Sequence, residues 1–292
     1  MVFAECEDRE LKAQQCQHRA ALLQLKDRSS STGAAGHTNM DHRVAVEPRR
    51  LDYPPVPDGF TIYAVGDIHG RVDLLDEVHA LIDEDTTSSR SERKVEIYLG
   101  DYIDRGSDSA NVITHLIKRT SQVFTIFLRG NHEQLLLDFL DGKDCWAEWK
   151  AVGCIPSCLS YGIEPGLLSG HMPPGAVRQA LEESLPADHV HFYTDTSAYC
   201  SVGPYLFVHA GIRPGIKLAD QTMTDMLGIR RIFLDFEGDL GFIVVHGHTP
   251  VSAPDLRKHR INIDTGAFAT HRLTCLRMDC EGVRILTPGR RE

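Results

Sequence analysis

The sequence of 292 residues has no apolar run close to the roughly 20 residues that a membrane-spanning helix requires. Its longest apolar stretch, around residues 242–245, has only the length of a strand. The first residues contain several acids and no apolar segment, so they do not resemble a secretory signal peptide. No Asn-x-Ser/Thr glycosylation motif occurs either. We therefore expect a cytoplasmic protein without a membrane partner.

Basic charge is also scarce. The chain has 31 Lys and Arg against 41 Asp and Glu, which gives a formal net charge of −10. Nucleic acids and anionic membranes attract proteins that have a basic face, so we expect no nucleic-acid partner. The phosphate-binding loops G-x4-GK[ST] and GxGxxG are absent, and nucleotide binding by those loops is therefore unsupported.

The eight cysteines do not form a recognisable zinc motif. Cys154 and Cys158 make a C-x3-C pair, but no second cysteine pair or nearby histidine pair has the spacing of a structural zinc site. Their even number permits disulfides. A long chain with a core of its own and no secretion signal nevertheless favours free thiols.

The composition is that of a globular protein, with 42% hydrophobic and 25% charged residues. Residues 1–50 differ from the rest, because they contain a helix-forming segment at 7–26 and a polar stretch but no strand pattern. We interpret 1–50 as a disordered N-terminal extension and 51–292 as the folded domain.

From residue 60 onward, strands alternate with helices. Predicted strands cover 60–65, 94–99 and 122–128, and predicted helices follow them at 72–82, 110–117 and 134–140. This order predicts an α/β domain with parallel strand pairing. Residues 141–195 change to a helical, loop-rich pattern, which we interpret as an insertion. Strand patterns then resume at 204–211, 242–250 and 260–266, and a hairpin turns near 279–282.

Side chains of the kind that bind metals follow five of these strands. They are Asp67, His69, Asp101, Asn131, His209 and His248. Each one alone has an ordinary explanation as a turn former or a hydrogen-bonded histidine. Functional groups of α/β sheets gather at the carboxyl ends of strands, so we expect the six to converge. Oxygen and imidazole ligands suit Mn, Fe, Zn or Mg, and six of them fit two ions that share a carboxylate.

Five motifs carry a family resemblance. They are GDIHG (66–70), GDYIDRG (100–106), GNHE (130–133), VHAG (208–211) and HGHT (246–249). Together they resemble the calcineurin-like metallophosphoesterases, and more narrowly the PPP phosphoprotein phosphatases in their bacterial and lambda-phage-like branch. The similarity covers about 52–290. It implies a two-sheet β-sandwich flanked by helices.

The resemblance also implies a ligand set for two divalent cations. Asp67 and His69 would hold the first ion, and Asp101 would bridge both. Asn131, His209 and His248 would hold the second. Mn is the expected metal, with Fe, Zn or Mg as alternatives.

Four further residues match positions that act on the substrate in this family. His132 matches the general acid, and Asp104 matches the carboxylate that orients its imidazole. Arg105 matches a phosphate-binding arginine. The segment MLGIRRIFL points to Arg230 as a second one, although its neighbours depart from the family pattern, which has acids at 231 and 232 and tryptophan at 228.

We therefore expect a metal-dependent phosphomonoesterase that hydrolyses phosphoserine, phosphothreonine and also phosphotyrosine in proteins by direct in-line attack of a metal-activated hydroxide. A symmetrical dinucleoside-tetraphosphate hydrolase is the alternative. Those enzymes typically have GDLVxRG and GNHD, where this chain has Asp104 and Glu133. An inactive, phosphatase-like binding module is the non-enzymatic alternative. The sequence contains no signal for an oligomeric state.

Overall fold

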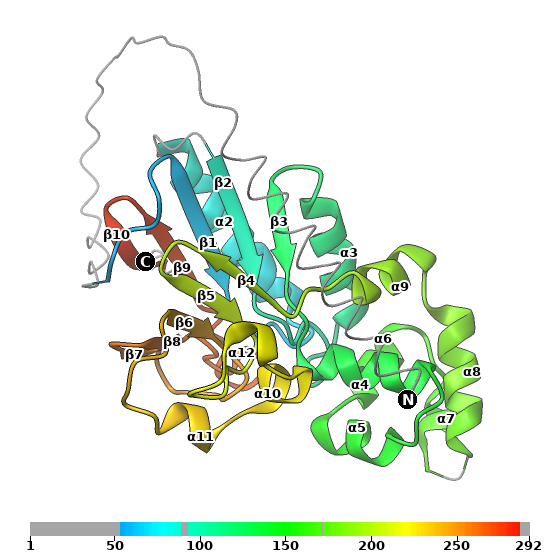
Figure 1. Cartoon of the computed structure of the whole chain (residues 1–292). Helices are drawn as coiled ribbons and strands as arrows, with labels where there is room; N and C mark the ends of the chain where they lie inside the picture. Colours follow the sequence, from blue (N-terminus) through cyan, green and yellow to red (C-terminus); the bar gives the residue numbers. More distant parts are fainter. Residues whose placement is uncertain (1–52, 89–92, 171, 287–292) are drawn as a thin grey trace. The chain divides into compact units, whose positions relative to one another are not determined.

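Two five-stranded β-sheets form the centre of the computed structural model, which describes residues 53–88, 93–170 and 172–286 (Figure 1). The first sheet has the strand order β10 (Gly282–Leu286), β9 (Cys275–Asp279), β1 (Phe60–Val65), β2 (Arg93–Tyr98), β3 (Phe124–Phe127). The second has the order β4 (Tyr199–Val202), β5 (Tyr205–Val208), β6 (Ile243–His246), β8 (Arg260–Asn262), β7 (Asp255–Arg257). The predicted α/β fold with two sheets flanked by helices is confirmed. The predicted N-terminal extension, 1–50, lies outside the described residues.

Strand β1 is the middle strand of the first sheet. It pairs in parallel with β2, so that Ile62 faces Val95, and antiparallel with β9. Its residues from Thr61 to Val65 are all buried. A strand covered on both faces is typically a continuous β-branched and aromatic run, which explains the sequence FTIYAV. The hairpin predicted near 279–282 joins β9 to β10.

Three helices follow the first three strands. They are α2 (Val72–Ser88), α3 (Ser109–Arg119) and α4 (Asn131–Leu140). Apolar side chains of α2 and α3, among them Leu75 and Val112, share one buried cluster with Val65 and Tyr98 of the sheet. Helix α2 is longer than predicted. Helix α4 begins three residues earlier than predicted, which places Asn131 and His132 in its first turn.

Five short helices follow α4 and precede β4. They are α5 (Trp146–Val152), α6 (Ile155–Ser160), α7 (Pro165–Leu168), α8 (Pro174–Ser184) and α9 (Ala187–Thr194). Figure 1 shows them grouped beside α4. The rings of Trp146 and Trp149 lie 5.1 and 5.5 Å from the ring of Phe139 in α4, which ties α5 to that helix.

Short elements complete the second sheet and its surroundings. They are the 3₁₀ turn η1 (Leu218–Asp220) and the helices α10 (Met223–Gly228), α11 (Arg231–Leu234) and α12 (Ala267–Thr270). Edge strands β4 and β7, which the sequence patterns did not reveal, pair antiparallel with their neighbours. The six described cysteines are free thiols. None of the described helices has the length and apolar character needed to cross a bilayer.

The strand directions explain where functional loops meet. Strands β1, β2 and β3 are mutually parallel, and so are β5, β6 and β8. The loops after parallel strands leave the sheet at the same edge. The GDIHG and GDYIDRG loops therefore emerge side by side from the first sheet, and the VHAG and HGHT loops emerge together from the second.

We predict that Leu75→Ala destabilises the domain by about 2–5 kcal/mol, because it leaves a cavity in the buried cluster between α2 and the first sheet. Urea unfolding followed by circular dichroism measures this change. Leu159→Ala is the matched control, since Leu159 is 44% exposed and its truncation should cost no more than about 0.5 kcal/mol. Equal losses in the two variants would contradict this account of the core.

Candidate active site

The six predicted ligands lie together at the ends of the strands. Each follows a strand of one of the sheets, as Asp67 follows β1, Asp101 follows β2 and His209 follows β5. Two sets of side chains could each hold a metal ion, with potential ligand atoms within 4.8 Å of one another. One set is His69, Asp101 and His132, and the other is Asp101, His209 and His248. The sets share Asp101, the residue predicted to bridge two ions.

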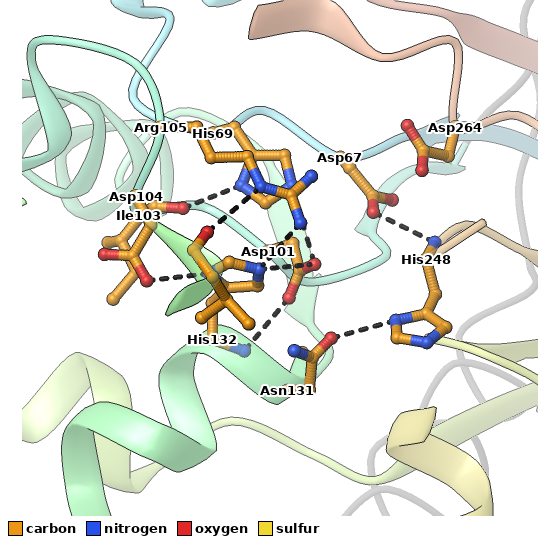
Figure 2. A network of polar contacts seen from close by, with 12 residues as sticks. Asp67, His69, Asp101, Ile103, Asp104, Arg105, Asn131, His132, His248 and Asp264 are labelled. Carbon is orange, nitrogen blue, oxygen red and sulfur yellow. Dashed lines mark hydrogen bonds and ion pairs between the residues drawn. The ribbon is translucent and has the colours of Figure 1, made fainter. Parts of the chain in front are cut away.

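Asp101 lies at the middle of the network (Figure 2). Its Oδ2 atom is 3.6 Å from Nε2 of His69 and 3.7 Å from Nε2 of His132. Its Oδ1 atom is 3.4 Å from Nε2 of His209. One carboxylate thus faces imidazoles from three separate segments of the chain, with Oδ2 near His69 and His132 and Oδ1 near His209.

Asn131 and Asp67 join the same network. Oδ1 of Asn131 lies 2.9 Å from Nδ1 of His248 and 3.2 Å from Nε2 of His209. The backbone N–H of His248 donates to Oδ2 of Asp67 across 2.9 Å. Figure 2 shows Asp67 and His248 on the side of Asp101 that lies opposite His132. All six predicted ligands are therefore in one connected cluster.

Two buried polar atoms in this cluster fit a cation. Nδ1 of His69 lies 2.8 Å from the carbonyl oxygen of Ile103, which can only accept, so Nδ1 carries the proton. Burial lowers the pKa of His69 to about 3, so at neutral pH the ring is neutral and its Nε2 lone pair is available. That Nε2 atom and Oδ1 of Asp67 are buried and have no hydrogen-bond partner among the residues that the structure describes. An unpaired imidazole nitrogen and an unpaired carboxylate oxygen are ligands for a divalent ion.

The electrostatics of the site also favour bound positive charge. Asp67 and Asp101 are each only 2% exposed. Burial and the nearby carboxyl of Asp264 raise the pKa of Asp67 well above its ordinary value. Burial opposes the charged form of His209, but the carboxylates of Asp101 and Asp67 outweigh it and raise the pKa of His209 to about 10. The same negative charge favours a cation bound beside these carboxylates.

The backbone of the site is held in an unusual conformation. Five of the six described non-glycine residues with positive φ lie here: His69 (47°), Asp101 (51°), Asp104 (73°), Arg105 (66°) and His248 (65°). Left-handed backbone at such residues is energetically unfavourable and clusters at functional sites.

Two glycines leave room for the carboxylates of the cluster. A Cβ atom at Gly247 would overlap the carboxylate of Asp67, and one at Gly130 would overlap that of Asp101. The glycines of HGHT and GNHE therefore permit the backbone to approach these carboxylates closely.

Beside the predicted ligands, His132 forms the predicted pair with Asp104. Its Nδ1 atom is 2.7 Å from Oδ2 of Asp104. Its Nε2 atom faces the cluster and lies 3.3 Å from Nη2 of Arg105. Burial disfavours the imidazolium, but the carboxylates of Asp101 and Asp104 outweigh this effect and raise the pKa of His132. An imidazole nitrogen and a guanidinium group therefore lie next to each other beside the cluster.

Arg230 lies at the exposed rim. Its Nη1 atom donates to Oγ1 of Thr249 across 3.3 Å, next to His248 in the HGHT loop. Its charge is among those that lower the pKa of His248, although burial is the largest cause and brings that pKa to about 3. Arg230 is thus close enough to the cluster to contact an anion bound there.

Sequence reasoning missed several residues that support the site. Glu133 is fully buried and accepts backbone N–H groups from Gly130, Asp101 and Tyr102 at 2.8–2.9 Å. The ring of Phe268 lies under the guanidinium of Arg105, 4.8 Å from its carbon. Glu133 stood in the GNHE motif, where only the preceding residues were assigned a role. Phe268 had no local signal.

Comparison with known proteins identifies a family and several relatives. The model of the calcineurin-like phosphoesterase family matches residues 60–279. The chain is similar to the asymmetrical bis(5'-nucleosyl)-tetraphosphatase PrpE of Oceanobacillus iheyensis, with 25% identity over 234 residues that cover 73% of this chain and 86% of that protein. The protein of the same name in Bacillus subtilis is 25% identical over 236 residues, which cover 73% and 88%.

Two crystal structures share the fold. One is of a protein proposed to be a diadenosine tetraphosphatase, with a TM-score of 0.52, 17% identity and coverage of 80% of this chain and 95% of the other. The second is of a mutant cold-active protein tyrosine phosphatase, with a TM-score of 0.52, 14% identity and coverage of 80% and 83%. At these identities the likeness supports the fold and not the substrate.

We predict that Asp101→Asn weakens Mn²⁺ binding by more than about 10-fold, because one charged oxygen is lost at the centre of the cluster. Isothermal titration calorimetry of the protein with Mn²⁺ measures this affinity. Asp76→Asn is the matched control, since Asp76 is exposed and pairs with His115 outside the cluster. Unchanged affinity in the Asp101 variant would exclude it as a ligand.

Proposed function

The chain belongs to the calcineurin-like phosphoesterase family, and from this premise we propose that it is a metal-dependent hydrolase that cleaves dinucleoside tetraphosphates asymmetrically. The observation that carries the proposal is the similarity to PrpE proteins over 73% of this chain and 86–88% of theirs. This similarity favours the alternative of the sequence analysis over the protein phosphatase. It also replaces the symmetrical cleavage of that alternative by an asymmetrical one.

The proposed reaction consumes one water. The oxygen of water attacks a phosphorus at one end of the tetraphosphate bridge, and the bond from that phosphorus to the next bridging oxygen breaks. The products are a nucleoside monophosphate and a nucleoside triphosphate, with one oxygen and two protons added in total.

The proposed cofactors are two divalent cations, with Mn²⁺ ahead of Fe, Zn or Mg. Asp67 and His69 would hold one, Asn131, His209 and His248 would hold the other, and Asp101 would contact both. Bound divalent ions would supply charge neutralisation on the phosphoryl oxygens and lower the pKa of a bound water to near neutrality.

The chain's own side chains would perform the remaining work. Arg105 has a planar guanidinium that matches two phosphoryl oxygens, and its position against Phe268 holds that plane in place. His132 directs Nε2 into the same space and would protonate the departing oxygen. Asp104 accepts a hydrogen bond from the Nδ1–H group of His132. Arg230 extends the positive charge towards the rim, where further phosphates of a polyphosphate would lie.

A protein phosphatase is the second candidate, and the pair of His132 and Asp104 favours it. The oxygen that leaves from a seryl or threonyl phosphoester is strongly basic and needs a proton as it departs. A polyphosphate leaving group is far less basic, so its departure depends much less on protonation. A well-formed acid with its carboxylate 2.7 Å away is therefore more important for a phosphoprotein than for a dinucleotide.

We predict that the Mn²⁺-loaded protein converts diadenosine tetraphosphate to ATP and AMP in equal amounts. Chromatography of the nucleotide products measures this directly, beside phosphate release from phosphoserine, phosphothreonine and phosphotyrosine peptides. Formation of ADP alone would indicate symmetrical cleavage. Turnover of peptides but not of the dinucleotide would contradict this proposal and support the protein phosphatase function. Asp101→Asn should abolish either activity.

We predict that Arg230→Ala raises KM for the dinucleotide by about 10-fold or more, because the variant would lack the hydrogen bond from the Arg230 guanidinium to a phosphate of the substrate. Steady-state kinetics measure KM and kcat separately. Arg231→Ala provides the matched control, since Arg231 is the adjacent exposed arginine and should change KM by less than about 2-fold. Equal effects would remove the specific role of Arg230.

A further inference from the structure

The carboxylate of Asp104 is surrounded by donors that come from the helices between β3 and β4. We propose that Trp149 of α5 and Ser157 of α6 are positioning residues, which fix Asp104 and through it the imidazole of His132 for protonation of the leaving oxygen. This inference rests on the proposed phosphohydrolase function. It assigns to these two helices a positioning role in a site whose ligands come mainly from the strand-end loops.

Both oxygens of Asp104 are occupied. Oδ2 accepts from Nε1 of Trp149 across 2.8 Å and lies 2.7 Å from Nδ1 of His132. Oδ1 accepts from Oγ of Ser157 across 2.6 Å. Trp149 is 1% exposed, Ser157 is 3% exposed, and Asp104 and His132 are fully buried. A buried carboxylate with three donors is held in one orientation, because any rotation would leave a charged oxygen unpaired.

Ser157 also holds the backbone of Asp104. The N–H of Asp104 donates to Oγ of Ser157 across 2.7 Å and lies 3.1 Å from Oγ of Ser109. Asp104 has left-handed backbone geometry, with φ at 73°, which is unfavourable for a residue with a side chain. The hydroxyl of Ser157 therefore accepts from the backbone of Asp104 and donates to its side chain. These two hydrogen bonds stabilise the left-handed conformation of Asp104.

The same segment holds the phosphate-binding candidate. The N–H of Arg105 donates to the carbonyl oxygen of Gly153 across 2.9 Å, and Nε of Arg105 lies 3.3 Å from the carbonyl oxygen of Val152. Figure 2 shows Asp104 and Arg105 on the same side of Asp101 as His132. The end of α5 and the start of α6 thus set the positions of both a proton donor and a guanidinium.

The geometry distinguishes Trp149 from its neighbour Trp146. The ring of Trp146 stacks on Phe139, with centroids 5.1 Å apart and the planes 27° from parallel, as expected of a packing residue. The ring of Trp149 also packs against Phe139, but its N–H group points to the carboxylate. Replacement of either tryptophan by phenylalanine keeps most of the buried ring, and only at position 149 does it remove a donor to Asp104.

The test uses the full-length, Mn²⁺-loaded protein and two aryl phosphates that differ in the basicity of the leaving phenolate. These are phenyl phosphate, which needs a proton on its leaving oxygen, and p-nitrophenyl phosphate, which needs it much less. We expect Trp149→Phe and Ser157→Ala to lower kcat for phenyl phosphate by about 10-fold or more, and kcat for p-nitrophenyl phosphate by less than about 3-fold. Ser157→Thr, which keeps the hydroxyl, should restore the phenyl phosphate rate, and Trp146→Phe should leave the ratio of the two rates unchanged.

A second measurement does not depend on turnover. In Mg²⁺-loaded protein labelled with ¹⁵N-histidine, which avoids the paramagnetic broadening of Mn²⁺, the Nδ1 proton of His132 should give a downfield NMR signal that disappears in Asp104→Asn. We expect this signal to shift in Trp149→Phe and Ser157→Ala and to remain in place in Trp146→Phe. Equal loss of both aryl phosphate rates, or an unshifted signal in the Trp149 and Ser157 variants, would overturn the inference. Absence of turnover of diadenosine tetraphosphate by the metal-loaded wild-type protein, with the signal shifting as expected, would instead refute the proposed function alone.

Discussion

Two carboxylates buried in one small site are the constraint on which the rest of this structure depends. Asp67 and Asp101 are each only 2% exposed, and burial of uncompensated negative charge is strongly unfavourable. The imidazoles of His69, His132 and His209 surround Asp101, and the carboxylates raise the pKa of His209 to about 10. A divalent cation would compensate the buried negative charge more completely, because it would also engage the atoms of Asp67 and His69 that have no partner among the described residues.

The need to surround two buried carboxylates with compensating groups explains the backbone conformation around the site. Bringing two carboxylates and several imidazoles to one point requires loops that turn sharply as soon as a strand ends. Left-handed conformations at Asp101 and His248, and glycines whose missing Cβ atoms leave room for the carboxylates, are the means by which the chain does so. The unfavourable local geometry persists because buried strands and the elements that follow them hold the chain on either side of it.

The helices α5 and α6 fix the orientation of two residues of the site. The strand-end loops supply Asp104 and Arg105, but α5 and α6 supply the groups that hold them, through Trp149, Ser157 and the carbonyl of Gly153. The chain is acidic overall, with a net charge of −10, and yet its site gathers Arg105 and Arg230 around a cluster suited to cations. Average charge therefore describes the surface that a partner meets, while the local field at the site is set by a few buried groups.

The sequence by itself determined the α/β fold and the set of residues at the centre, because each one directly follows a strand within a short motif such as GDIHG or GNHE. Strand patterns and glycine turns are local signals, and parallel pairing within each sheet then brings the motifs of that sheet to one edge. Only the tertiary structure decided what surrounds them. Phe268 of α12 reaches Arg105, and Trp149 of α5 reaches Asp104. These contacts join residues that are far apart in the chain, and no local pattern of residues encodes which buried donor will meet which buried acceptor.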